Sequence, residues 1–348
     1  MMKIRNILEE REAKILSPFA QLSKNTRGRL RYEPECDIRP AFQHDRDKII
    51  HSKSFRRLKH KTQVFLAPTG DHYRTRLTHT LEVSQIARTI AKALGLNEDL
   101  VEAISLGHDL GHTPFGHAGE EVLNIIHKGG FRHYEHSLRV VDKLERDGRG
   151  LNLTIEVRDG ILKHSKGKGA IIIKDKEDKP LTKEAEIVRM ADVIAYINHD
   201  IDDAKAGNVI TEEDIPEDCR RFLGNTHSKR IDTMVRGVIN ESLNDPEINL
   251  SFGEELEFYI FKLRDFLYER VYDTNLVHGD FIKCSRIITD LYDYFLKNPD
   301  EFLKETKKED FYDDPANCVC DFIASMTDRY AFNLFEKIFL PLPWNIPV

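Results

Sequence analysis

Apolar side chains recur at intervals of three and four residues along most of the chain, which is the spacing of amphipathic helices. In the first half, this pattern predicts helices over residues 45–58, 77–94, 98–109, 118–127, 134–144 and 154–163. The longest helix is expected over residues 183–206, and further helices are expected near residues 228–243, 252–272, 280–296 and 316–338. Only residues 170–173 are suited to a short strand, so the expected fold class is all-α.

Turn and capping residues support these boundaries. Gly95 is suited to ending the helix before it, and Asn97 and Thr182 are suited to capping the helices that follow them. A glycine and a proline interrupt the stretch around residues 112–116, which is therefore expected to form a loop. Residues 165–180 are rich in glycine and lysine, and we expect an exposed loop there.

The composition is that of an ordinary globular protein. Of the 348 residues, 40% are hydrophobic and 32% are charged, and no run of about 18 apolar residues could span a membrane. The N-terminal residues lack the apolar segment of a secretory signal. The five cysteines are scattered and form no Cys-x-x-Cys pair, so we expect free thiols in a cytoplasmic protein and no thiolate zinc site.

Charge is distributed unevenly along the chain. Residues 1–76 hold 18 lysine and arginine residues against 9 aspartate and glutamate residues, so the remainder must be acidic to reach the net charge of −7. A basic run from Lys53 to Lys61 is expected on the outer face of its helix. This basic segment favours an anionic substrate or effector, such as a polyphosphate or a nucleic acid. A solvated surface balanced by the acidic remainder explains it equally well.

Residues 108–120 concentrate the candidate chemistry, because three histidines, an aspartate and a glutamate lie within this one stretch. A second polar set lies in the helix over residues 183–206, where Asp192, Tyr196 and Asp200 are four residues apart and share one face. Asp192 has apolar neighbours, so we expect it to be buried against a cation or hydrogen-bond donors. A solvated face is the open alternative for Asp200, Asp202 and Asp203.

The two helices that precede this stretch are joined by a short link, which would bring His79 close to His108 and Asp109. With Asp192 they form a set of two histidines and two carboxylates. Such a set suits a divalent ion such as Mn, Mg, Co, Ni, Fe or Zn, and leaves positions open for water and a substrate oxygen. A rival arrangement pairs His108 with His112 as on a zinc-peptidase helix, but the intervening aspartate is shorter than the required glutamate and glycine and proline break that helix.

Several stretches resemble the HD-domain deoxynucleoside triphosphate triphosphohydrolases, the dGTPase-like family. They are Phe-Arg-Arg-Leu-Lys-His-Lys-Thr-Gln-Val-Phe over residues 55–65, Arg-Leu-Thr-His over 76–79, the His-Asp stretch over 108–120, Ala-Asp-Val-Ile-Ala-Tyr over 191–196 and Met-Thr-Asp-Arg-Tyr over 326–330. The resemblance implies an HD metal phosphohydrolase core with a basic N-terminal segment over residues 1–206. It also implies a helical C-terminal region over residues 207–348 that packs on this core.

The resemblance further implies which residues carry the chemistry. The metal ion would be held by His79, His108, Asp109 and Asp192, and Asp109 would also count among the catalytic residues. His117 and Glu120 match the family's catalytic pair, with His117 next to the scissile phosphate and Glu120 orienting it. Attack at the α-phosphorus expels the 5′-oxygen, and a histidine held by a carboxylate is suited to protonating that leaving group.

The same resemblance implies the substrate contacts. Gln63 and Asp200 would contact the sugar 3′-hydroxyl, and Tyr196 would pack against C2′ and leave no room for a ribose hydroxyl. Arg76 and His133 match phosphate-contacting positions.

Two histidine roles stay open at this stage. His112 is suited either to contacting phosphate or to ordering its loop. Either His133 or His136 could point at the phosphates, because this stretch resembles the family only loosely.

The implied activity is hydrolysis of a deoxynucleoside triphosphate, such as dGTP, to a deoxynucleoside and tripolyphosphate by water attack at the α-phosphorus. The resemblance also implies a homo-oligomer, often a hexamer, and a deoxynucleoside triphosphate as an allosteric effector. Nucleic acid is a further partner that the activity does not require, and no membrane is expected. The alternatives are another HD phosphohydrolase, acting on a nucleoside monophosphate or a cyclic nucleotide, and a nucleic-acid-binding regulatory protein with an HD site.

Overall fold

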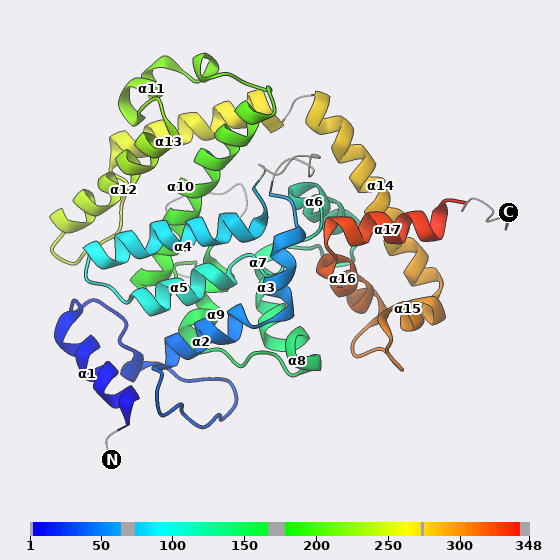
Figure 1. Cartoon of the computed structure of the whole chain (residues 1–348), viewed down its shortest axis with the longest axis horizontal. Coiled ribbons are helices and arrows are strands. Elements are labelled where there is room, and N and C mark those ends of the chain that lie inside the picture. The colour runs from blue at the N-terminus through cyan, green and yellow to red at the C-terminus, as the bar shows by residue number, and fades with distance from the viewer. Residues whose placement is uncertain (1–2, 64–73, 166–177, 273–274, 342–348) are drawn as a thin grey trace, which may run out of the picture.

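The computed structural model describes residues 3–63, 74–165, 178–272 and 275–341, and these residues form helices joined by turns and loops (Figure 1). Within these ranges there is no β-strand, and the only β-type pairings are two isolated bridges. The all-α prediction is therefore confirmed. The strand expected over residues 170–173, and most of the loop around it, lie outside the described residues. None of the described helices is both long enough and apolar enough to cross a membrane.

The helices of the first half are α1 (Ile4–Ile15), α2 (Ala41–Ile50), α3 (Lys53–Arg57), α4 (Arg76–Ala93), α5 (Glu98–Gly107), α6 (Gly116–Ile126), α7 (His133–Arg139), α8 (Glu145–Gly148), α9 (Ile155–Lys163) and α10 (Lys183–Ala206). Those of the second half are α11 (Glu217–Leu223), α12 (His227–Asn244), α13 (Glu254–Leu267), α14 (Asn275–Lys297), α15 (Pro299–Thr306), α16 (Pro315–Ser325) and α17 (Asp328–Phe339). Short 3₁₀ segments are η1 (Ser23–Asn25), η2 (Leu58–His60) and η4 (Glu212–Asp214), and π-helical segments are η3 (Val140–Leu144) and η5 (Tyr268–Tyr272).

Two of the predicted helices are each divided into two shorter helices in the structure, so the prediction of a continuous helix was wrong in both places. The helix expected over residues 45–58 is interrupted after α2, because the Ser52 hydroxyl accepts a hydrogen bond from the Phe55 amide and begins α3. The helix expected over residues 316–338 is divided in the same way, since the Thr327 hydroxyl caps α17. The caps at Asn97 and Thr182 are confirmed, as both side chains accept backbone amides.

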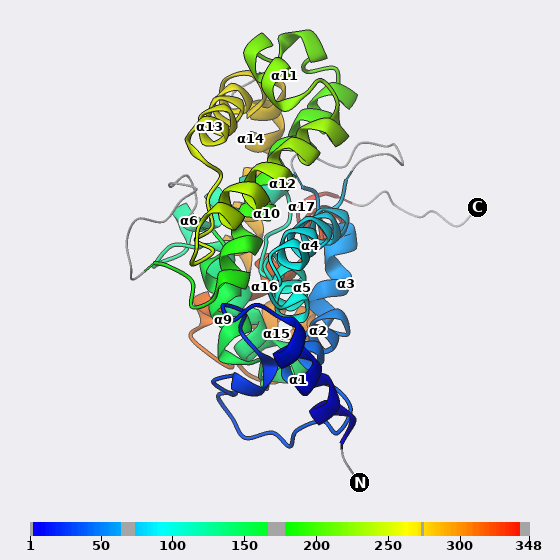
Figure 2. The same ribbon diagram turned by 90° about the vertical axis from the view of Figure 1, so that its left-hand side faces the viewer.

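The first hydrophobic core forms around α10, which packs against α4, α5 and α9. Its predicted apolar stripe is buried throughout, at Ile187, Met190, Ile194, Ile197 and Ile201. Figure 2 shows α11 and α13 at the end of the molecule opposite α1, and this core continues into α12 and α13. The first core includes residues on both sides of residue 206. The division of the chain into two regions at that point stays a prediction.

A second hydrophobic core joins α6 to the C-terminal helices α14, α15, α16 and α17. Polar contacts connect it to the loop before α6. The Lys61 ammonium group donates to the carbonyl oxygens of His112 and Ala324, and the Asp328 carboxylate accepts the amides of Thr62 and Phe115 at 2.9 Å. Lys61 is only 2% exposed, so its expected place on an outer helix face was wrong. Its Nζ–H groups are used inside, where they satisfy buried carbonyl oxygens.

Candidate metal centre and active site

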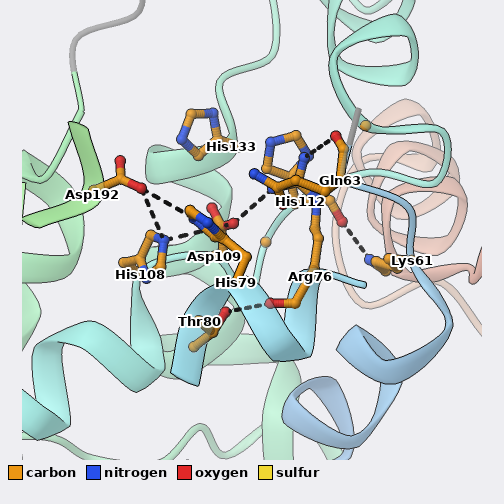
Figure 3. A network of polar contacts seen from close by, with 12 residues as sticks. Lys61, Gln63, Arg76, His79, Thr80, His108, Asp109, His112, His133 and Asp192 are labelled. Atoms are coloured by element: carbon orange, nitrogen blue, oxygen red, sulfur yellow. Dashed lines mark hydrogen bonds and ion pairs between the residues drawn. The ribbon is translucent and has the colours of Figure 1, made fainter. Parts of the chain in front are cut away.

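Four side chains from three helices meet at the centre of the first core (Figure 3). His79 lies in the first turn of α4, His108 and Asp109 follow the end of α5, and Asp192 lies in the middle of α10. The His79 Nε2 atom is 3.1 Å from Asp192 Oδ1, and His108 Nε2 is 3.6 Å from Asp109 Oδ2 and 3.8 Å from Asp192 Oδ1. The structure thus brings together all four residues expected to hold a metal ion.

The state of His108 fits a metal ligand. Its Nδ1 atom donates to the carbonyl oxygen of Ser105 at 2.6 Å, which leaves Nε2 as the ring nitrogen that can bind a metal. That nitrogen is buried and has no hydrogen-bond partner among the described residues. A buried polar atom left in this way is costly unless another group, such as a cation, satisfies it.

The carboxylates are ionised. Burial acts to raise the pKa of Asp109, but the charges of His108 and Arg76 hold it well below its usual range. Burial likewise opposes ionisation of Asp192, yet the hydrogen bond from His79 and the nearby histidines bring its pKa to about 2. Negative oxygens and imidazole nitrogens therefore converge within a few ångströms, and clusters of this kind could hold a divalent ion.

His79 is supported by a pair that the sequence analysis missed. His199 Nδ1 lies 3.2 Å from His79 Nδ1, and His199 Nε2 lies 2.7 Å from Glu82 Oε2. This chain of contacts orients His79 so that its Nε2 atom faces Asp192 and the cluster. A signal was present, because His199 comes seven residues after Asp192 and so lies on the same side of α10.

Glu120 makes its hydrogen bonds with His133. It accepts the His133 backbone amide and the His133 Nδ1–H group, each at 2.9 Å, and the ring of His112 stacks on that of His133 at 4.7 Å. His117 is exposed, and ligand atoms of His112, His117 and Glu120 lie within 4.8 Å of one another. The expected His117–Glu120 pair is therefore close in space, with His133 added to it.

His133 and His136 point in different directions in the structure. His136 Nδ1 donates to the carbonyl oxygen of Gly111, and its Nε2 atom is 3.2 Å from Asp321, on the side of the C-terminal helices. Only His133 faces the cluster. Gly111 explains the close approach of α7, because a Cβ atom there would overlap the backbone of Ser137.

The rival pairing of His108 with His112 on one helix is wrong, since α5 ends at Gly107. The His112 ring is buried against His133, and its carbonyl oxygen accepts from Lys61. These contacts order the loop, and they leave His112 Nδ1 without a partner among the described residues.

The expected substrate contacts line the same region. Arg76 donates to Asp109 Oδ2 at 2.6 Å and to the Gln63 carbonyl oxygen at 3.4 Å, while Gln63 Oε1 is buried without a partner among the described residues. Asp200 accepts a hydrogen bond from the Tyr272 hydroxyl. The Oδ1 atom of Asp200 is also buried without a hydrogen-bond partner among the described residues. Tyr196 lies between Asp192 and Asp200 on α10 and is partly buried.

The solvated face considered for the end of α10 was wrong for two of its three aspartates. Asp200 is 2% exposed and Asp203 is 6% exposed, because α10 passes beneath other helices along its whole length. Burial raises the pKa of Asp200 to about 7. Asp202 is half-buried and pairs with His227 at 2.9 Å.

His164 is a further histidine of this region that the sequence analysis missed. It follows α9 directly and is 2% exposed. Its Nε2 atom lies 3.2 Å from that of His133, and its ring lies 4.9 Å from that of His108. The sequence offered no spacing that connects it to the other histidines, since it stands alone before the glycine- and lysine-rich stretch.

Comparisons with known proteins agree with this geometry. The HD domain matches residues 76–197, and the phosphohydrolase-associated domain matches residues 250–337. The chain is 57% identical to a deoxyguanosinetriphosphate triphosphohydrolase-like protein of Caldanaerobacter subterraneus, over 99% of this chain and 98% of that protein. Proteins described in the same words in Desulfatibacillum aliphaticivorans and Clostridium tetani are 51% and 45% identical, each over 98% of this chain and over 99% and 97% of their own lengths.

Proposed function

This chain belongs to the HD-domain family of deoxyguanosinetriphosphate triphosphohydrolase-like proteins, and from that premise we propose that it hydrolyses a deoxynucleoside triphosphate to a deoxynucleoside and tripolyphosphate. The observation that carries the proposal is the buried nitrogen of His108, left without a partner among two carboxylates and a second histidine. That arrangement supports a metal centre at which a phosphate ester is cleaved by water.

The divalent ion, one of Mn, Mg, Co, Ni, Fe or Zn, would be held by His79, His108, Asp109 and Asp192. When bound, such an ion lowers the pKa of a coordinated water molecule and offsets charge on a phosphoryl group. The Arg76 guanidinium group, anchored by Asp109, adds a fixed positive charge beside the same site.

His117 is the residue that we propose as the proton donor to the 5′-oxygen. As the bond between the α-phosphorus and this oxygen breaks, the leaving alkoxide requires a proton. The ring of His117 is exposed and so can reach a bound substrate, and Glu120 lies within reach of it. Glu120 is ionised, because hydrogen bonds and charge from His133 outweigh its burial and bring its pKa to about 2.

The sugar and phosphate contacts follow from unsatisfied groups. Gln63 and Asp200 each present a buried oxygen with no partner among the described residues, and a 3′-hydroxyl group could satisfy them. Tyr196 would pack against C2′ and select against ribose. His112 and His133 would lie toward the phosphates.

Assembly, regulation and location form the finer part of the proposal. We propose a homo-oligomer, such as a hexamer, a second deoxynucleoside triphosphate as its effector, and a cytoplasmic location. Light scattering with and without dATP or dGTP measures the size of the oligomer and whether a nucleotide changes it. A mass that stays that of a single chain under all conditions would contradict the assembly.

The activity test is direct. Incubation with dGTP and Mn²⁺ should release tripolyphosphate and deoxyguanosine in equal amounts, as followed by ³¹P NMR and chromatography. His117→Ala should lower kcat by about 10²- to 10⁴-fold while the protein still binds Mn²⁺. Release of orthophosphate or pyrophosphate would instead favour a different HD phosphohydrolase reaction.

A further inference from the structure

The imidazole rings of His133 and His164 face one another beside the metal centre. Their Nε2 atoms are 3.2 Å apart, although the residues come from α7 and from the end of α9. Both side chains are buried, with 8% and 2% of their surface exposed. Figure 3 shows His133 beside the labelled metal-centre side chains.

The other nitrogen of each ring is already occupied. His164 Nδ1 donates to the carbonyl oxygen of Ile161 at 2.8 Å, and His133 Nδ1 donates to Glu120 at 2.9 Å. Each Nε2 atom is therefore left facing the other ring, where a proton between them makes a hydrogen bond and, with both rings neutral, the two lone pairs can bind one positive ion. Two lone pairs at this distance repel unless a positive group lies between or beside them.

His164 is held in the same way as His108. Each follows the last residue of a helix, α5 for His108 and α9 for His164, and each donates from Nδ1 to the carbonyl oxygen three residues earlier. This fixes the tautomer and aims Nε2 toward the carboxylates. The helix ends thus supply two equivalent, preorganised nitrogen donors.

The spacing fits two ligands of one ion. With metal–nitrogen bonds of about 2.1 Å, neighbouring ligands lie about 3.0 Å apart at a right angle and about 3.4 Å apart at a tetrahedral angle. The separation of 3.2 Å between His133 and His164 falls between these values. Carboxylates flank both rings, since ligand atoms of Asp109 and His133 lie within 4.8 Å, as do those of Asp192 and His164.

We propose that His133 and His164 bind a second divalent transition-metal ion, with Asp109 and Asp192 as carboxylates shared with the first site. Nitrogen and oxygen donors together select an ion such as Mn²⁺, Fe²⁺ or Zn²⁺. The proposal concerns metal binding and does not depend on which substrate the protein hydrolyses. A failure to cleave dGTP would therefore leave it intact.

The test counts bound metal without any nucleotide. Full-length protein is stripped with chelator, loaded with Mn²⁺, desalted, and assayed by mass spectrometry of the metal. We expect about two ions per chain, with an electron paramagnetic resonance spectrum of two coupled Mn²⁺ ions. One ion per chain with an uncoupled six-line spectrum would overturn the proposal and leave the two rings joined by a shared proton.

Variants locate the second ion. His164→Gln should reduce the count to about one and replace the coupled spectrum by the six-line spectrum, and His133→Gln should do the same by removing the other donor. His127→Gln is the matched control, because His127 contacts Tyr292 and not the metal centre. If both variants fold and still bind two coupled ions, the assignment of the second site to His133 and His164 is wrong. If a variant fails to fold, the metal count of the wild-type protein decides the test.

Discussion

His199 shows how a residue that touches neither metal nor substrate can set the affinity of the site. It links His79 Nδ1 to Glu82 and so holds His79 Nε2 toward Asp192 and the proposed metal site. His199→Leu should weaken Mn²⁺ binding by about 10- to 100-fold, as measured by calorimetry. His199→Gln, whose amide oxygen can accept from His79, should lose less. Equal affinities in wild type and the leucine variant would show that the link is not used.

Asp200 makes stability depend on pH. Burial raises its pKa from 3.8 to about 7, so between these values the folded state keeps a proton that the unfolded state releases. Stability therefore falls as pH rises, by up to about 1.4 kcal/mol for each pH unit in that window. Asp200→Asn should raise the free energy of unfolding, and the gain measured in urea should be larger at pH 8 than at pH 5.

Asp202 provides the control on the same helix. Its hydrogen bond from His227 outweighs its burial and lowers its pKa, so its charged form is favoured by folding. Asp202→Asn should accordingly lower stability at pH 8. If each substitution changed the free energy of unfolding by the same amount at pH 5 and at pH 8, the pH dependence would not come from the burial of Asp200.

At the scale of residues, the sequence identified the four side chains proposed to hold the metal but not the residues that support them. His79, His108, Asp109 and Asp192 were predicted to meet because helix geometry and the family motifs both connect them. His164 and His199 were missed because their partners are set by how α9 and α10 cross the other helices. The spacing of residues along the chain does not reveal how two helices cross.

Among the elements, the prediction of helices was reliable where one face is continuously apolar, as in α10, and failed where a hydroxyl begins a new helix. Ser52 and Thr327 each lie inside an apolar pattern that continues on both sides, so periodicity alone joins the helices. Capping residues within a pattern are ambiguous, since serine and threonine also occur in the middle of helices.

The start of α17 controls the loop that carries His112 and His117. Asp328 binds the amides of Thr62 and Phe115 with its two oxygens, and Phe115 has a left-handed backbone with φ of 63°. Asp328→Asn removes one acceptor and should cost about 1–3 kcal/mol of unfolding free energy. The loop should also loosen, so that kcat falls while the metal content stays unchanged.

Asp232→Asn is a suitable comparison, because Asp232 forms only an exposed pair with Arg236 on α12. It should change stability by less than about 0.5 kcal/mol. A loss of stability in Asp328→Asn no greater than this would contradict the role of α17 in holding the loop.

For the whole molecule, several basic residues of the N-terminal segment form ion pairs with acids. Arg39 pairs with Asp47, Arg46 pairs with Asp47 and with Glu102, and Lys48 pairs with Glu33. These pairs reduce the number of free basic side chains on which a nucleic-acid-binding function would depend.

Metal should stabilise the entire fold, because its ligands join α4, the end of α5 and α10 across the first core. At 100-fold excess over its dissociation constant, a bound ion contributes about 2.7 kcal/mol, which for a chain of this size raises Tm by about 4 °C. Calorimetry of wild type with Mn²⁺ and with EDTA measures this difference. His108→Gln should abolish most of it, whereas His127→Gln should keep it, since only the first removes a ligand from the centre. An equal rise in both variants would mean that Mn²⁺ acts elsewhere on the surface.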